Sequence, residues 1–265
     1  MFINPIPARV HSLGKTFALF VLTVACFQSV SFSQTVEQAK TFHVNGTVTA
    51  TNNGISLIPS FSLGRPAAFF DFSVGGERLS FDPMFRFGMD GKPWTFVLWG
   101  RYKVIKDKRF TLSVGAHPAF MFRDMTVLVD GKPVTMMGTQ RFIAGEILPM
   151  YKVNNHFSVG IYYLQGHGLN PIPPKSSKFL ALNTVFSNLA LSKEISLRMN
   201  PQVYFLSVDG VTGTYVTSSF TVTKKDFPIG FQTLFNQKIK SDVAGDNLVW
   251  NLSLLYNFST NFSKK

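Results

Sequence analysis

The sequence predicts an all-β fold, a closed antiparallel barrel of about twelve strands whose outer surface faces a membrane. Three observations support this prediction. Apolar and polar residues alternate with a period of two along most of the chain. Every second link between alternating segments is short, and aromatic side chains gather near both ends of the segments. Past the N-terminal segment, no apolar stretch reaches the roughly 18 residues that a membrane-spanning helix needs.

The N-terminus predicts a secretory signal peptide. Arg9 and Lys15 precede the apolar run 16–30, and polar residues follow it up to Gln34. A basic start, a short apolar run and small residues near a cleavage site are typical of such a signal. We therefore expect residues 1–34 to be removed after export through the inner membrane; the alternative is a retained helical anchor. Cys26, the only cysteine, lies in this segment, so no disulfide or cysteine-based metal site is expected.

Charge and composition exclude several function classes. The chain carries a net charge of +12, but only 15% of its residues are charged. Its basic residues are scattered among turns and strand interiors instead of forming a helical basic face, so nucleic-acid binding is not expected. Neither a nucleotide-binding motif nor a metal-ligand cluster with meaningful spacing appears, and we expect no cofactor and no metal.

The alternation is clearest at 248–258, where apolar Leu248, Trp250, Leu252 and Leu254 flank polar Asn251 and Ser253. Most segments are long enough for a tilted strand that crosses a bilayer, which needs about 9 to 11 residues. Residues 35–53 are expected to be a periplasmic lead-in, 54–258 the barrel and 259–265 a tail. The twelve predicted strands are 54–63, 67–74, 79–88, 93–104, 109–123, 139–151, 155–167, 178–190, 194–207, 212–224, 228–238 and 247–258.

The links between these segments predict which end of the barrel is which. Short turns alternate with longer links, a pattern that outer-membrane barrels share, with the turns in the periplasm and the loops outside. The even strand count places both termini on the turn side. The link 124–138 is the longest and carries Leu128, Val129 and Met136, so it is the best candidate to fold into the barrel.

Outward-facing aromatic residues fall into two sets, one near each predicted membrane surface, where an apolar ring with a polar edge is favoured. The alternative is a soluble barrel with these aromatic residues in its core. A soluble barrel has polar residues outside and apolar residues inside, whereas here the polar set carries too much charge to form a core. The predicted aromatic girdles contain Phe87, Trp94, Phe122, Tyr163, Phe205, Tyr215 and Trp250 on the loop side, and Tyr102, Phe110, Tyr151, Tyr256 and Phe258 on the turn side.

With its alternating last strand, its two aromatic sets and its signal peptide, the chain resembles bacterial outer-membrane β-barrel proteins over nearly all of residues 54–258. The Ser33-Gln34 end of the signal resembles those of the Bacteroidota. The resemblance implies a porin-like architecture, a location in the outer membrane of a Gram-negative cell, contact with outer-membrane lipid and insertion by the barrel insertion machinery. It implies no catalytic residue and no oligomeric state.

One feature conflicts with regular strands. Prolines lie inside five predicted strands, where each removes a donor from the hydrogen-bond ladder. We expect bulges or kinks at these positions. They are Pro59, Pro83, Pro118, Pro149 and Pro201.

The alternation points several polar residues into the lumen, which leaves two interpretations. Fixed charges at a constriction select ions, so the barrel is a passive or weakly anion-selective channel for small solutes. Alternatively, arginines and carboxylates pair inside a non-conducting barrel that anchors or scaffolds a partner. The lumen-lining candidates are Asp71, Asp82, Arg86, Arg101, His117, Arg123, Glu146 and Arg198.

A third interpretation is an outer-membrane enzyme. His167 lies at the loop-side end of its predicted strand, where Asp124 or Asp209 from other loops would complete a rim site. No recognised hydrolase motif supports this interpretation.

Overall fold

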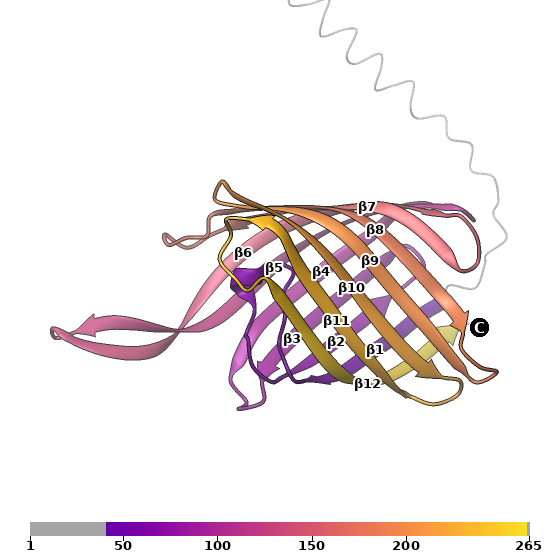
Figure 1. Ribbon diagram of the computed structural model, residues 1–265, viewed down its shortest axis with the longest axis horizontal. Helices are drawn as coiled ribbons and strands as arrows, with labels where there is room; N and C mark the ends of the chain where they lie inside the picture. The colour runs from indigo at the N-terminus through magenta and orange to yellow at the C-terminus, as the bar shows by residue number, and fades with distance from the viewer. Residues whose placement is uncertain (1–40, 264–265) are drawn as a thin grey trace, which may run out of the picture. The chain divides into compact units, whose positions relative to one another are not determined.

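The computed structural model describes residues 41–263, which form a closed barrel of antiparallel strands (Figure 1). Each strand pairs with its neighbours in the chain, and β1 pairs with β12 to close the ring. In the described range no helix is long and apolar enough to cross a membrane. The strands are β1 (Thr41–Thr51), β2 (Ala67–Gly75), β3 (Leu79–Gly88), β4 (Pro93–Lys106), β5 (Phe110–Val129), β6 (Lys132–Lys152), β7 (Phe157–Gly168), β8 (Ser176–Ala190), β9 (Ile195–Val208), β10 (Val211–Lys224), β11 (Ile229–Ser241) and β12 (Leu248–Ser263).

The predicted fold class, a closed antiparallel barrel of twelve strands, is confirmed. The predicted signal peptide, residues 1–34, lies outside the described residues. Turns at 76–78, 107–109, 153–156, 191–194 and 225–228 mark one end of the barrel, called the turn side below. The other connections mark the loop side.

The wall of the barrel has its apolar side chains on the outside. Along β12, Leu252 is 57% exposed while its neighbours Asn251 and Ser253 are only 5% and 3% exposed. The same contrast holds on β11, where Phe235 is 42% exposed and Asn236 is 5% exposed. A water-soluble barrel has the opposite arrangement, so this apolar outer surface fits contact with lipid.

The first strand differs from the prediction. Residues 54–63 were expected to be β1, but they form an irregular segment with one 3₁₀ turn, Pro59–Phe61. The strand is instead Thr41–Thr51, inside the predicted periplasmic lead-in. It alternates Val44, Gly46 and Val48 with polar residues, but threonine and asparagine outnumber the apolar residues and hide the pattern. At the other end, β12 extends through most of the predicted tail and pairs with β1 up to Ser263.

The prediction that 124–138 is a loop that enters the barrel is also wrong. β5 and β6 continue as a paired hairpin to the turn Asp130–Gly131, and Figure 1 shows this hairpin projecting past the loop-side end of the other strands. Both turn residues have positive φ, 50° and 73°. Asp-Gly is a strong signal for such a hairpin turn. The turn Asp209–Gly210 between β9 and β10 has the same conformation.

The prolines within strands do not produce the expected bulges. At Pro83, Pro118, Pro149 and Pro201, pairing with one neighbouring strand is interrupted and resumes in the same register. At Pro201 the gap is bridged by a side chain, since Thr184 Oγ1 donates to the Pro201 carbonyl at 2.6 Å. Pro59, the fifth, lies in the 3₁₀ turn and in no strand.

Two residues of the predicted aromatic girdles face inward, which corrects their assignment. Trp94 is 3% exposed, because a register shift between β3 and β4 turns it into the lumen. Tyr215 is 1% exposed and lies directly opposite inward-facing Tyr204. Of the other predicted girdle residues, the more exposed are Tyr102, Tyr151, Phe205, Trp250, Tyr256 and Phe258, and the half-buried are Phe87, Phe110, Phe122 and Tyr163.

The interrupted ladder at Pro149 generates a stability prediction. An added Cβ at Gly160 on β7 would lie 2.2 Å from the Pro149 carbonyl oxygen, a backbone atom that cannot move aside alone. We expect Gly160→Ala to lower the free energy of unfolding by about 1–3 kcal/mol, the usual cost of overpacking. Urea unfolding in detergent micelles measures it.

The matched control is Gly100→Ala on β4, where the nearest atom to an added Cβ is 3.9 Å away. Its unfolding midpoint should stay near that of the parent protein. Equal losses in the two variants would contradict a specific clash at Pro149.

Candidate functional site in the barrel lumen

The segment 52–66 between β1 and β2, here called the inner segment, folds into the loop-side end of the lumen. Trp94 Nε1 on β4 donates to the Phe61 carbonyl at 3.0 Å, and the Phe61 ring packs on Phe142 of β6 at 5.5 Å. Internal backbone bonds hold the segment together, from Gly54 N to Arg65 O at 2.9 Å and from Leu63 N to Gly54 O at 2.8 Å. The inner segment is therefore a packed part of the lumen.

Ile58 of the inner segment packs into an aromatic cluster on the opposite wall. The rings of Phe179, Tyr204 and Tyr215 stack in a row, with centroids 4.7 and 4.9 Å apart. Val243 from the β11–β12 loop belongs to the same buried cluster. The Tyr204 hydroxyl donates to Asn236 Oδ1 at 3.0 Å, so the polar end of the buried ring is satisfied. Together, the inner segment and this cluster fill the loop-side half of the lumen.

A charged cluster lies on the β3–β7 wall. Arg101 Nη1 contacts Asp82 at 2.9 Å and its Nε contacts Glu146 at 2.6 Å. Tyr162 donates to Glu146 at 2.8 Å, and Ser73 donates to Asp82 at 2.6 Å. Each buried carboxylate thus has two or more donors (Ser80 also bonds Asp82). Such satisfaction offsets much of the cost of removing these charges from water.

His117, another predicted lumen residue, is 8% exposed and packs on the neighbouring Trp99, with ring centroids 4.0 Å apart. The Arg101 guanidinium lies over the same Trp99 ring at 4.3 Å. This arrangement extends the charged cluster into a static, packed part of the wall.

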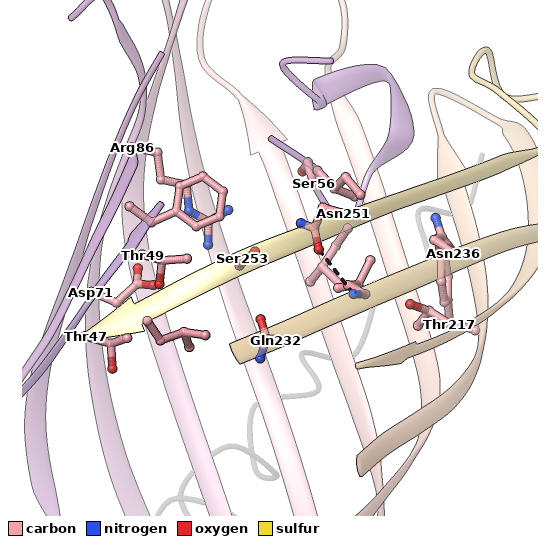
Figure 2. A pocket seen from close by; sticks show the side chains of 16 residues that line it. Thr47, Thr49, Ser56, Asp71, Arg86, Thr217, Gln232, Asn236, Asn251 and Ser253 are labelled. Carbon is pink, nitrogen blue, oxygen red and sulfur yellow. Dashed lines mark hydrogen bonds between the residues drawn. The ribbon is translucent and has the colours of Figure 1, made fainter. Parts of the chain in front are cut away.

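Below the inner segment lies a polar chamber of about 370 Å³. Figure 2 shows Ser56 of the inner segment above it, Asp71 and Arg86 on one side, and Gln232 and Asn251 on the other. The amides are partly engaged, since Asn251 Oδ1 accepts from the Leu234 backbone at 3.2 Å. Asp71 Oδ1 and Arg86 Nε, in contrast, are buried and have no hydrogen-bond partner in the described part of the chain. The chamber therefore contains a carboxylate and a guanidinium that each keep one buried atom without a hydrogen bond.

Two further cavities adjoin the chamber toward the turn side. One of about 780 Å³ shares Thr47 and Asp71 with it, and one of about 560 Å³ shares Thr47 and Gln232. Arg198 lines both of these cavities. The turn-side half of the lumen is thus a hollow, polar space, in contrast to the filled loop-side half.

Arg123 lies elsewhere, at the exposed loop-side rim, where it lines a separate cavity of about 280 Å³ above the inner segment. Nearby, Arg65 at the end of the inner segment contacts Asp90 of the β3–β4 turn at 2.6 Å. This guanidinium holds the pKa of the Asp90 carboxyl below its ordinary value. The ion pair ties the end of the inner segment to the rim.

The structure does not bring the predicted rim-site residues together. His167 is exposed and pairs with Ile143 on the outward face of the wall. The Asp209 carboxylate accepts from the backbone of Lys175 and Ser176, and Asp124 contacts Lys92. Within residues 41–263, no group of three His, Cys, Asp or Glu side chains is placed to hold a metal ion.

The sequence prediction missed the inner segment and the residues that it covers. Pro59, together with Gly54 and Gly64 nearby, was a signal of irregular backbone in this stretch. No pattern along the sequence shows that Phe179 and Tyr215 stack on Tyr204.

Comparisons with known proteins give only the architecture. No family model matches the chain, and no curated protein matches it. Solved structures do resemble it: OmpT, an outer membrane protein of Vibrio cholerae, with 8% identity over 85% of this chain and 100% of that one, at a TM-score of 0.40. The beta domain of the Bordetella autotransporter BrkA is 11% identical in sequence; the match covers 84% of this chain and 100% of that one, with a TM-score of 0.44. The translocator domain of the autotransporter NalP from Neisseria meningitidis is 10% identical; the match covers 94% of this chain and 98% of that one, with a TM-score of 0.43.

The predicted resemblance to bacterial outer-membrane β-barrels is confirmed at the level of architecture by the closed antiparallel barrel that the chain itself forms. At these scores no residue role passes from those proteins to this chain. The resemblance to Bacteroidota proteins stays a prediction.

The charged cluster generates a second prediction. Arg101→Gln leaves Glu146, whose side chain is 3% exposed, without its main partner. Removing one member of a buried ion pair typically costs about 3–5 kcal/mol. We expect a loss of that order in the free energy of unfolding, measured by urea unfolding in micelles, and a smaller loss when Glu146→Gln accompanies Arg101→Gln.

Lys106→Gln is the matched control, because Lys106 pairs with Glu77 at the exposed turn side. Surface pairs contribute about 0–1 kcal/mol, so its midpoint should hardly change. If Arg101→Gln behaved like Lys106→Gln, the cluster would not be a structural element of the wall.

Proposed function

We propose that this protein is an outer-membrane barrel that forms a closed route for small polar solutes, with the inner segment as its gate. The observation that carries this proposal is the division of the lumen into a filled loop-side half and a hollow, polar turn-side half. In this proposal the turn side faces the periplasm, lipid surrounds the wall, and the barrel insertion machinery places the chain in the membrane.

The contacts of the inner segment support a closed state. It reaches both walls, through Phe61 to Trp94 and Phe142 and through Ile58 to the aromatic cluster. Barrels of this size lie between eight-stranded ones, which leave space only for side chains, and those of about sixteen strands, which enclose a channel. In such a barrel, one folded segment is enough to close the passage.

The lining of the turn-side half supports a polar solute rather than an anion. The carboxylates of Asp71 and Asp82 offset two of the three guanidinium groups that line these cavities, Arg86, Arg101 and Arg198. Buried Glu146, which pairs with Arg101, offsets part of the remaining positive charge. Anion selectivity needs an excess of fixed positive charge at the constriction. We therefore propose weak charge selectivity in place of the anion preference that the sequence suggested.

The gate is tested by planar-bilayer conductance. We expect the parent protein to be silent or to open rarely. A variant in which residues 54–63 are replaced by a short Gly-Ser linker should give reproducible conductance steps, because Ile58 and Phe61 no longer fill the lumen.

A control deletion shortens the β5–β6 hairpin by removing residues 126–129 and 132–135, which pair only with each other, and keeps the Asp130-Gly131 turn. This variant should remain as silent as the parent. Equal conductance in the parent and the linker variant would contradict gating. Silence of a correctly folded linker variant would favour a non-conducting barrel that anchors a partner.

Charge balance gives a further prediction on the opened variant. Its reversal potential in a salt gradient should show weak selectivity. Adding Arg198→Gln removes one fixed positive charge from the two turn-side cavities and should shift the preference toward cations. Lys106→Gln, at the exposed turn side, should leave the reversal potential unchanged; an equal shift would mean that lumen charge does not set selectivity.

A further inference from the structure

The chamber beneath the inner segment contains two opposite charges, Asp71 and Arg86, that are not joined by a hydrogen bond at Asp71 Oδ1 or Arg86 Nε. Asp71 lies opposite Met84, so Arg86, two residues further along β3, is its diagonal neighbour across the strand pair. Diagonal neighbours are about 7–8 Å apart at their Cα atoms, close enough for long side chains to meet. Yet Asp71 Oδ1 and Arg86 Nε have no hydrogen-bond partner among the described residues.

The contrast with the charged cluster on the same wall is informative. There, Arg101 contacts two carboxylates and each of those receives further donors. Burying a polar group without a hydrogen-bond partner costs free energy, and burying a charged one costs more. Because such groups are rare, each needs an explanation. Both side chains line the same chamber, and a ligand with complementary charges would supply the missing hydrogen bonds to both.

The aromatic side chains of the chamber argue against a sugar as that ligand. Sugar rings commonly stack on free aromatic faces. Tyr204 has Phe179 and Tyr215 stacked on it, at 4.7 and 4.9 Å between centroids. The Arg86 guanidinium lies over the Phe69 ring at 5.0 Å. Neither chamber aromatic therefore offers an open platform.

The rest of the lining fits a small ligand that is charged at one end and apolar at the other. Ile55, Leu57 and Leu255 contribute apolar surface. Two amides can orient the ligand. Gln232 uses its Nε2 to donate to Thr221 at 2.8 Å, which leaves its Oε1, and Asn236 uses its Oδ1 to accept from Tyr204 at 3.0 Å, which leaves its Nδ2. The volume of about 370 Å³ lies near the lower end of the usual range for ligand pockets, about 300–1,000 Å³.

We propose that this chamber binds a small zwitterion, an α-amino acid with an apolar side chain. Its carboxylate lies at Arg86, its ammonium group at Asp71, and its side chain against Leu57 and Leu255. Arginine binds carboxylates well because its donors form a planar fork. The solute enters through the turn-side cavities. Its identity as the transported solute rests on the proposed function, whereas its binding does not.

Equilibrium binding tests the site directly. The full protein in detergent micelles is titrated calorimetrically with leucine, valine and alanine, and in parallel with glucose, propionate and propylamine. We expect saturable binding of the amino acids and at least tenfold weaker binding of propionate and propylamine, which each lack one of the two charges. A charge-assisted hydrogen bond contributes about 1.5–3 kcal/mol, equivalent to a tenfold change in affinity or more.

Two substitutions inside the chamber test the location of the site, and a third substitution outside the chamber is the control. Arg86→Gln and Asp71→Asn should each weaken amino-acid binding at least tenfold. Arg198→Gln, which lines the turn-side cavities but not the chamber, should bind as the parent does. Heat-modifiable gel migration shows that each variant is folded. If Arg86→Gln fails to fold, Asp71→Asn alone decides.

Each outcome is decisive for the site. The proposal is supported if binding requires both charges of the ligand and is weakened by both Arg86→Gln and Asp71→Asn. No binding of any amino acid would mean that the chamber holds only water and would overturn the proposal. Preferential binding of glucose, or amino-acid binding that is insensitive to both substitutions, would overturn it too. Since micelle binding needs no conduction, leucine binding by the parent protein together with a silent linker variant would refute the gate and leave the site intact.

Discussion

Inside a bilayer no water is available to satisfy a backbone N–H or C=O group, so every strand of a spanning sheet must pair on both sides. The pairing of β1 with β12 is the contact that meets this requirement for the whole wall. It depends on Thr41–Thr51, in which Phe42, Val44, Val48 and Ala50 alternate with polar residues. The ladder gaps at the in-strand prolines are tolerated because register is kept and side chains such as Thr184 bridge the exposed carbonyls.

Closure also creates an interior, and the chain fills that interior unevenly. Toward the loop side, Ile58, Phe61 and the stack around Tyr204 form a core like that of a soluble protein. Toward the turn side the lining is polar and hollow. One wall carries a fully paired charged cluster at Arg101, while in the chamber beside it Asp71 Oδ1 and Arg86 Nε have no hydrogen-bond partner among the described residues. The first arrangement stabilises the wall, and the second is available for a ligand.

The sequence predicted the strand number and most strand positions, because alternation with a period of two can be seen in the sequence itself. It failed where the pattern was weak or local signals were overlooked. Thr41–Thr51 has too few apolar residues to stand out, and Asp130-Gly131 was a hairpin signal inside an apparent loop. Trp94 and Tyr215 were predicted to face outward. A register shift between β3 and β4 turns the Trp94 side chain inward, and Tyr215 lies opposite inward-facing Tyr204. The chamber was beyond sequence reasoning, since its walls come from strands at both ends of the chain.

The inner segment connects β1 to β2, so it belongs to the hairpin next to the closing seam. Until β1 meets β12, the sheet is open and the segment lies beside an exposed edge. Once the two strands pair, the segment is enclosed, with Ile58 against residues of β8 to β10 on the far wall. Burial of the segment and formation of the seam are therefore linked steps in assembly. A chain that closes this seam with the segment already folded encloses a filled lumen at once and does not pass through an open, leaking pore.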